Sequence, residues 1–171
     1  MNRVASSRSV FTGDCQLTAD PQVSFQLVLG SCVAACVWDA KAEIGGVNHF
    51  LLPFADADAA RGPDARKVGG AFLMERLIEA LVERGATLGR LQARIFGGGN
   101  LIGSSVGQRN IDFATVFLRN RRIPLLSSDV GGGAARWLRV WPAQGQVEVR
   151  HVGQSSPSPA SRGGAPAAIG I

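Results

Sequence analysis

The chain has 171 residues, of which 46% are hydrophobic and 18% charged. This composition provides enough apolar side chains for one folded domain, and it excludes a wholly disordered chain and a fibrous repeat protein. The three cysteines are too few for a disulfide-rich secreted protein, and their odd number favours reduced thiols in the cytoplasm.

Charge is distributed unevenly along the chain, whose net charge is +5. Residues 1–83 carry 7 basic and 10 acidic side chains, whereas residues 84–171 carry 11 and 3. A basic half of this kind fits an acidic protein partner, a nucleic acid or an acidic membrane surface, or is a solvated arginine-rich surface. Nucleic acid is disfavoured because tyrosine is absent and no motif combines aromatic and basic residues for base stacking.

The longest uncharged run, residues 21–38, contains proline, glycine, serine and glutamine, so it does not predict a membrane helix. The segment Val33–Cys36 resembles a lipoprotein cleavage box. However, Asp14 and Asp20 lie upstream of it, where a signal peptide avoids acidic residues. We therefore expect a cytoplasmic protein without membrane insertion.

Residues 1–10 are small and polar and predict a flexible tail ahead of a domain over residues 11–152. The first part of this domain has the short apolar runs that are typical of strands. These strands are expected at residues 23–29, 32–38 and 43–52. Residues 55–65 then predict a polar loop.

Two helices are expected in the second part of the domain. Apolar residues recur at three- and four-residue spacings over residues 68–84, and Gly85 ends this helix. A strand at residues 91–96 leads into the glycine run 97–99, and the second helix covers residues 107–120. The inward face of that helix is expected to consist of Ile111, Ala114, Phe117 and Leu118.

Three further strands are expected at residues 123–127, 135–141 and 146–152, the last two as an antiparallel hairpin. Residues 153–171 are rich in glycine, proline, alanine and serine and predict a disordered tail. Together, these elements predict a mixed α/β or α+β domain in which two helices cover a largely antiparallel sheet system.

Hairpin geometry brings one cysteine and one histidine together. If Ala40 and Lys41 form the turn between the second and third strands, Cys32 lies directly opposite His49. The β-carbons of such a pair are about 4.5–5.5 Å apart, which lets an imidazole meet a thiol. A turn one residue longer or shorter would spoil this match.

A thiol beside an imidazole is the simplest nucleophile–base pair, because the histidine takes the thiol proton and the thiolate attacks a carbonyl carbon. Gly30 and Ser31 allow a tight bend that exposes the sulfur and leaves backbone N–H groups free for a developing oxyanion. Spacing alone leaves a second interpretation open, in which Cys32 is a small core residue and His49 a structural histidine.

The remaining motifs do not predict a metal or nucleotide site. Cys32 and Cys36 are four residues apart, but no further cysteine or histidine cluster completes a zinc site. The segment Gly97–Asn100 lacks the lysine and the spacing of a nucleotide-binding loop, so a close-packed glycine turn is expected there. His151 is expected at the surface.

Two segments carry a resemblance to a known family: LGSCV at Leu29–Val33 and GGVNHFLLP at Gly45–Pro53. Together they resemble the signature of the chemoreceptor glutamine deamidases, the CheD family of bacterial chemotaxis. Further similar segments are IFGG at 95–98 with Asn100, GQRN at 107–110, IP at 123–124 and DVGG at 129–132. The similarity covers roughly residues 23–152 in consistent order and spacing.

The resemblance implies conversion of specific glutamine side chains of methyl-accepting chemotaxis receptors to glutamate, and in some members hydrolysis of receptor methyl esters. It implies Cys32 as nucleophile and His49 as general base, acting through a thioester without metal or organic cofactor. It further implies a CheC-type phosphatase as a possible partner, and an α/β sandwich of β-sheets flanked by helices as the fold.

The chain departs from the family pattern at the third catalytic residue. The family usually has threonine six residues before the cysteine, where this chain has Gln26, and Ser24 on the same strand face is the alternative. The tyrosine-glycine pair usual before the long helix is replaced by Val68 and Gly69. We expect the substrate and oxyanion region to include Gly30, Ser31, Asn48, Gly97, Gly98 and Asn100.

Two other functions remain open on the sequence. The first is a non-catalytic adaptor that binds receptors or a CheC-type phosphatase, because Gln26 changes the third position and a lost orienting group costs orders of magnitude in rate. The second is another Cys–His acyl-transfer enzyme, such as a toxin-like deamidase that acts on a different protein.

Overall fold

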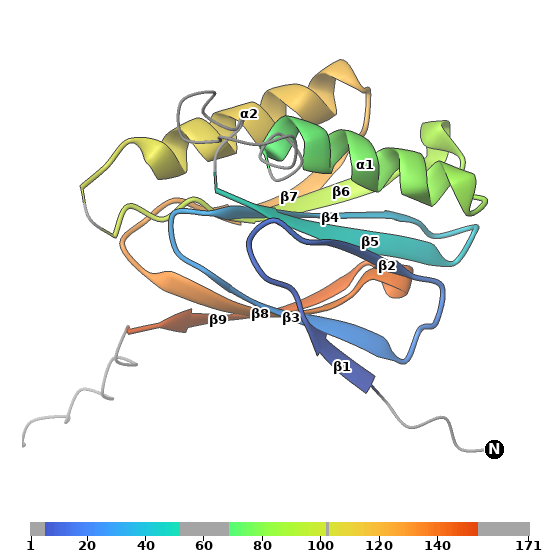
Figure 1. Ribbon diagram of the computed structural model, residues 1–171, viewed down its shortest axis with the longest axis horizontal. Coiled ribbons are helices and arrows are strands. Elements are labelled where there is room, and N and C mark those ends of the chain that lie inside the picture. The colour runs from blue at the N-terminus through green and yellow to red at the C-terminus, as the bar shows by residue number, and fades with distance from the viewer. Residues whose placement is uncertain (1–5, 52–68, 102, 154–171) are drawn as a thin grey trace, which may run out of the picture.

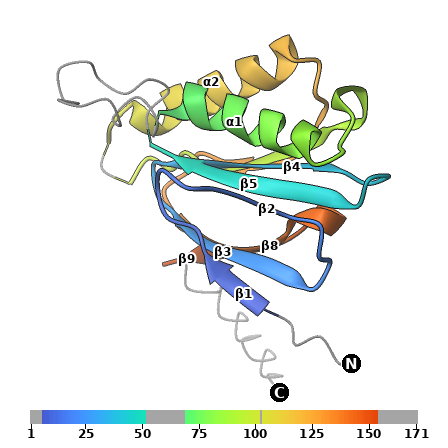
Figure 2. The ribbon, with the colours of Figure 1, turned by 45° about the vertical axis from the view of Figure 1, so that its right-hand side comes forward.

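The computed structural model describes residues 6–51, 69–101 and 103–153 (Figure 1). They form two β-sheets that face each other, and two helices lie side by side on the outer face of one sheet (Figures 1 and 2). The prediction of mixed β-sheets flanked by two helices is confirmed.

The larger sheet has five strands: β2 (Cys15–Thr18), β4 (Val33–Asp39), β5 (Ile44–Phe50), β6 (Gln92–Gly97) and β7 (Leu125–Val130). The smaller has four: β1 (Ser6–Ser9), β3 (Val23–Leu29), β8 (Ala135–Trp141) and β9 (Gln146–Val152). Their spatial orders are β2-β5-β4-β6-β7 and β1-β3-β8-β9. The helices α1 (Gly70–Glu83) and α2 (Val106–Asn120) lie on the five-stranded sheet.

Strands β4 and β5 are buried along their whole length, because one face meets the helices and the other meets the second sheet. In β4, Val33 and Ala35 pack towards the helices, whereas Ala34 and Cys36 pack towards the four-stranded sheet. This two-sided burial explains why the β4 sequence is almost continuously apolar instead of alternating. Each face therefore gives its residues a different set of neighbours.

Several sequence expectations differ from the structure near the N-terminus. Residues 6–10 were expected in a flexible tail, but Ser6–Ser9 form β1, parallel to β3, and the following Val10 is only 2% exposed. Strand β2 was not predicted at all. The expected strand at 43–52 ends at Phe50. The segments 1–5, 55–65 and 154–171, for which a tail, a loop and a second tail were expected, lie outside the described residues.

The other elements agree with the sequence apart from their bounds. The helices expected at 68–84 and 107–120 are α1 and α2, and the expected hairpin is the antiparallel pair β8–β9. The inward face of α2 is correct, because Ala114 and Leu118 are buried and Ile111 and Phe117 pack against the same core. None of the helices in the described part of the chain is both long and apolar enough to cross a membrane.

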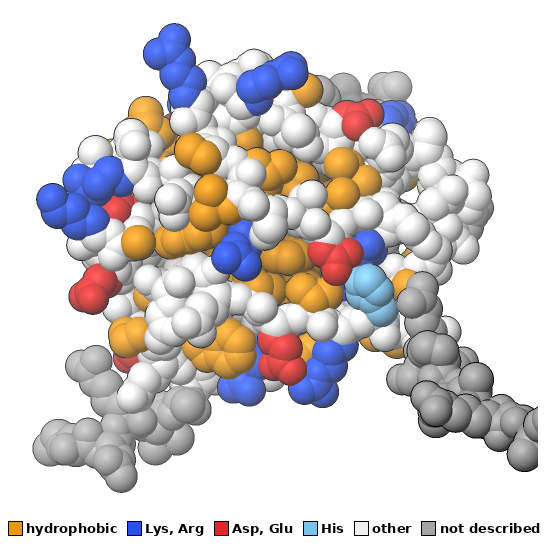
Figure 3. Space-filling view, turned by 180° about the vertical axis from the view of Figure 1, so that it is seen from behind, with side chains coloured by type: hydrophobic (Ala, Val, Ile, Leu, Met, Phe, Trp, Pro, Cys, Tyr) orange, Lys and Arg blue, Asp and Glu red, His pale blue; other side chains and the backbone are white. Residues whose placement is uncertain are grey.

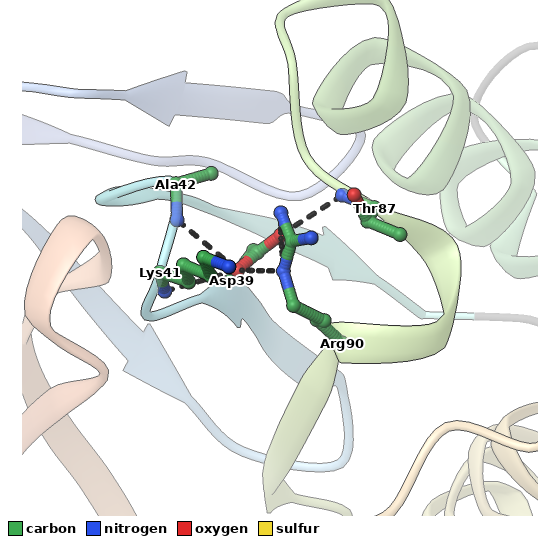
Figure 4. A network of polar contacts seen from close by, with 5 residues as sticks. All are labelled: Asp39, Lys41, Ala42, Thr87 and Arg90. Carbon is green, nitrogen blue, oxygen red and sulfur yellow. Dashed lines mark hydrogen bonds and ion pairs between the residues drawn. The ribbon is translucent and has the colours of Figure 1, made fainter.

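The turn between β4 and β5 corrects the predicted register. Four residues, not two, separate Asp39 from its partner Ile44. The Asp39 carboxylate accepts hydrogen bonds from the backbone N–H groups of Lys41 and Ala42 within the turn (Figure 4). His49 is therefore opposite Ala34, not opposite Cys32 as expected.

The same carboxylate joins this turn to the segment after α1. It accepts a hydrogen bond of 2.9 Å from the backbone N–H of Thr87 and forms an ion pair of 2.8 Å with Arg90 (Figure 4). Burial alone would raise the pKa of Asp39, but the hydrogen bonds from Arg90, Thr87 and Ala42 outweigh burial and lower this pKa to about 2. The ionised carboxylate thus fixes the turn, and the turn fixes the pairing of β4 with β5.

Candidate active site

Cys32 and His49 lie in contact where β4 begins and β5 ends. The Sγ atom of Cys32 is 2.9 Å from Nε2 of His49. His49 faces the four-stranded sheet together with its partner Ala34, and Cys32 lies two residues before Ala34 on the same face. The expected proximity is therefore confirmed, but through a diagonal pair, because a register change of two residues keeps both side chains on one face.

Hydrogen bonds to its three backbone carbonyl groups fix the turn that carries Cys32. The carbonyl oxygens of Gly30 and Cys32 each accept a hydrogen bond of 2.7 Å, from the backbone N–H groups of Gly99 and Gly98 respectively. The carbonyl of Ser31 accepts a hydrogen bond of 2.9 Å from the side chain of Asn110 on α2. All three carbonyl groups of residues 30–32 therefore have hydrogen-bond donors from other segments of the chain.

Burial favours the uncharged forms of both reactive side chains. It raises the pKa of the Cys32 thiol above its ordinary 9.0, although the N–H groups of Gly30 and Cys32 act in the opposite direction. Burial also lowers the pKa of His49 below 6.5, against the effects of the Val10 carbonyl and the Asp14 carboxylate. At neutral pH the resting pair is a thiol and a neutral imidazole.

A backbone carbonyl selects the tautomer of His49. The Nδ1 atom lies 3.3 Å from the carbonyl oxygen of Val10, which can only accept a hydrogen bond. We therefore assign the ring proton to Nδ1, which leaves the lone pair of Nε2 facing the Cys32 sulfur. This is the protonation state that a general base for the thiol requires.

The glycine run supports the cysteine turn. Gly97 has φ +99°, and a Cβ atom there would lie 2.1 Å from the carbonyl oxygen of Cys32. Gly98 uses its N–H on that same carbonyl, so this donor is not free for a substrate oxygen. Asn100 is exposed, and its N–H bonds to the carbonyl of Gly132. Glycine is needed at position 97 because the backbone there is left-handed and lies too close to the Cys32 carbonyl for a side chain.

Asn48 lies on the opposite face of β5 from His49. Its Oδ1 accepts the N–H of Ala35 at 3.0 Å, and its Nδ2 contacts the sulfur of Met74 on α1 at 3.1 Å. Asn48 is completely buried between the sheet and the helix. The structure therefore does not bring it together with Cys32, contrary to the expectation.

A cavity of about 260 Å³ opens beside His49. Its lining includes Thr12, Gln26, Phe11, Val28 and Trp137. Gln26 thus shares this cavity with the imidazole, but among the described residues its side-chain amide makes no hydrogen bond to His49. Ser24, the alternative, instead contacts Ser7 and Arg139.

Sequence reasoning missed the segment that surrounds His49. Thr12 Oγ1 lies 3.3 Å from Nε2, and Val10 contacts the other ring nitrogen. Val10 was expected in the N-terminal tail, no element was expected at Thr12, and no local pattern pointed to the histidine. His151 is exposed as expected and pairs with Asp129 at 2.8 Å. Within the described ranges, no group of three or more His, Cys, Asp or Glu side chains could hold a metal ion.

Comparison with known proteins identifies the family. A family profile described as "CheD chemotactic sensory transduction" matches residues 51–151. A Caulobacter sp. (strain K31) protein named "Probable chemoreceptor glutamine deamidase CheD" is 49% identical over 145 residues, which cover 84% of this chain and 76% of that protein. The chain belongs to the CheD family. A Rhizobium rhizogenes protein of the same name is 43% identical over 140 residues, or 81% of this chain and 76% of its own length.

Family membership confirms the expectation of a CheD-type amidohydrolase. The family profile begins after His49, but an alignment that covers 84% of the chain includes both Cys32 and His49. Two solved structures are more distant from this CheD chain. Bacillus licheniformis protein YfiH has a TM-score of 0.36 at 18% identity, covering 48% of this chain and 26% of its own. A Neisseria meningitidis protein has a TM-score of 0.39 at 9% identity, covering 70% and 52%.

Proposed function

We propose that this CheD chain hydrolyses the side-chain amide of specific glutamines on methyl-accepting chemotaxis receptors, releasing ammonia and leaving glutamate. The observation that carries the proposal is the 2.9 Å contact between the Cys32 sulfur and the unprotonated Nε2 of His49. The names of the CheD relatives support glutamine on chemoreceptors as the substrate.

The first half of the reaction makes a thioester. The thiol proton passes from Cys32 to Nε2 of His49, and the sulfur attacks the side-chain carbonyl carbon of the substrate glutamine. The oxygen becomes negatively charged and is stabilised by the N–H groups of Gly30 and Cys32. The imidazolium then donates its proton to the amide nitrogen, the C–N bond breaks and ammonia leaves.

The second half releases the product. His49, again neutral, takes a proton from a water molecule as that water attacks the thioester carbon. The C–S bond breaks, the substrate leaves as glutamate, and the thiol of Cys32 is restored. A glutamyl methyl ester would form the same thioester with methanol as the leaving group, so methylesterase activity is expected from the same residues.

Mass spectrometry of a receptor cytoplasmic fragment tests the proposal. Incubation with the unmodified protein should add about 1 Da at defined glutamines, and Cys32→Ala should abolish this gain. Cys15→Ala is the matched control, because Cys15 is a second partly exposed cysteine, with its pKa raised by burial to about 11, and lies outside the pair. Absence of the gain with every receptor of the host organism would refute the proposed activity.

A second function, a non-catalytic adaptor, is favoured by one observation: among the described residues, the side-chain amide of Gln26 makes no hydrogen bond to His49. The adaptor predicts binding to receptors or to a CheC-type phosphatase without any mass change. A toxin-like deamidase predicts mass gain on an unrelated protein instead. The proposed activity on receptors implies a cytoplasmic location, as expected from the unpaired cysteines.

A further inference from the structure

The segment Val10–Asp14, between β1 and β2, wraps around His49. Val10 binds one ring nitrogen, and the hydroxyl of Thr12 lies 3.3 Å from the other. We propose that Thr12 is a positioning residue for the Cys32–His49 pair, and that its hydroxyl stabilises the charged thiolate–imidazolium state. This inference rests on the proposed function, since it assigns a third residue to the same reaction.

The Nε2 atom of His49 is the ring nitrogen that changes its protonation state. Cys32 Sγ and Thr12 Oγ1 lie 2.9 and 3.3 Å from it, while Nδ1 stays engaged with the Val10 carbonyl. At rest Nε2 accepts a hydrogen bond, and after proton transfer it donates one. A hydroxyl can serve both states because it both donates and accepts, which neither a carbonyl nor a methyl group can do.

The position of Thr12 is built into the fold. The backbone N–H of Gly13 donates to the carbonyl of His49 at 2.7 Å, and the N–H of His49 donates to the carbonyl of Asp14 at 3.0 Å. The Asp14 side chain closes the turn by accepting the N–H of Phe11 at 2.8 Å. Thr12 is therefore held between fixed neighbours, although its own side chain is exposed at the cavity.

The neighbouring polar side chains leave this role to Thr12. Gln26 lines the same cavity, but in the described part of the chain its amide does not bond to His49. Ser24 is occupied by Ser7 and by the guanidinium of Arg139, at 3.2 and 3.1 Å. The hydroxyl that reaches the imidazole thus comes from the β1–β2 segment and not from β3.

The test uses Thr12→Val, which removes the hydroxyl at nearly constant shape, and Thr12→Ser, which keeps it. Thr115→Val, the same substitution on the exposed side of α2, is the matched control, and Gln26→Ala tests the rival residue in the same cavity. The first readout is alkylation of Cys32 by iodoacetamide from pH 6 to 10, followed on the Cys32 peptide by mass spectrometry, with Cys15 as internal reference. This readout needs no receptor, so it separates failure of the inference from failure of the proposed activity.

Loss of the hydroxyl removes a hydrogen bond to the charged pair, so Thr12→Val should shift the alkylation midpoint of Cys32 to higher pH and slow alkylation at pH 7.5 by about 10-fold. Thr12→Ser should restore the unmodified profile, and Thr115→Val should leave it unchanged. With a receptor substrate, Thr12→Val should lower kcat by a similar factor and leave KM nearly constant.

Three alkylation results would overturn the inference. One is an unmodified alkylation profile in Thr12→Val, another is an equal loss in Thr12→Ser, and the third is the shift appearing in Gln26→Ala instead. Circular dichroism and thermal melting of each variant, measured in parallel, show whether the fold is intact. A folded Thr12→Val protein with unchanged kcat would also exclude the proposed role.

Discussion

At the scale of single residues, burial favours the uncharged forms of both Cys32 and His49. Burial raises the pKa of Cys32 and lowers the pKa of His49. Both shifts favour the neutral form, thiol over thiolate and imidazole over imidazolium. The N–H groups around the sulfur offset part of this effect. In the proposed mechanism, charge therefore appears only during attack, and the same N–H groups would stabilise it.

The lowered pKa of His49 predicts the acid side of the pH profile. If neutral imidazole is the active base, as proposed, the acid limb of kcat/KM should be centred below pH 6.5, because burial lowers the pKa of His49. Initial rates of ammonia release between pH 5 and 8 measure this. An acid limb centred above pH 6.5 would contradict the environment described for His49.

Asn48, the neighbour of His49 in β5, is expected to contribute to stability and not to the reaction. Asn48→Ala leaves the buried N–H of Ala35 without its acceptor, so the free energy of unfolding should fall by about 1–3 kcal/mol. Because Asn48 faces α1, kcat should remain within about twofold of the unmodified value. Urea unfolding and deamidation rates of the same sample check both parts, and a large loss of kcat in a folded protein would disagree.

At the scale of elements, the turn between β4 and β5 determines which residues meet. Asp39 ties the turn to Thr87 and Arg90, so the register depends on contacts far along the chain (Figure 4). This explains why a two-residue turn was the natural prediction and was wrong: the carboxylate's partners after α1 cannot be read from the hairpin sequence.

The pKa of Asp39 gives a prediction for acid stability. Its folded-state pKa of about 2 lies below the ordinary 3.8, so the ionised carboxylate stabilises the fold above pH 3.8, and this stabilisation is lost as the pH falls towards 2. Asp39→Asn should lower Tm by about 5 °C or more at pH 6, since partners of a buried carboxylate are left unsatisfied. The difference from the unmodified protein should shrink between pH 4 and 2. A constant difference across that range would contradict the assignment.

The sequence predicts those contacts of the site that join adjacent strands, and it misses those that depend on the pairing of distant segments. Cys32 and His49 could be paired because they lie on adjacent strands, and alternation of side chains places them on one face even with the register wrong by two. Thr12 could not be found, because its contact with His49 needs the pairing of β2 with β5. Strand β1 was missed because Ser6–Ser9 are polar and mostly exposed at a sheet edge.

At the scale of the whole molecule, one face carries a patch of apolar side chains. Seen from behind, hydrophobic side chains gather in the middle of the face, and most Lys and Arg side chains stand towards its margins (Figure 3). Exposed apolar residues also border the candidate site, where Phe11 and Val28 are 70% and 64% exposed. A partner that docks there would bury these apolar side chains.

The net charge of +5 predicts how substrate binding depends on salt. If the arginine-rich half attracts an acidic receptor segment, raising NaCl from 50 to 300 mM should increase KM by about threefold or more, with kcat little changed. Steady-state deamidation at the two salt concentrations measures this effect, with an uncharged glutamine peptide as control. An equal response of both substrates would assign the salt effect to something other than attraction.

The four-residue turn after Asp39 also limits how this chain can tolerate insertions and deletions. Neighbouring residues of β5 face opposite sides, with His49 towards the sulfur and Asn48 towards α1. An insertion of one residue at positions 40–43, with β4 held in place, exchanges these two faces and brings the amide of Asn48 to the place of the imidazole. A change of two residues keeps an imidazole on the correct side. Turns of even and odd length therefore differ in chemistry as well as in shape.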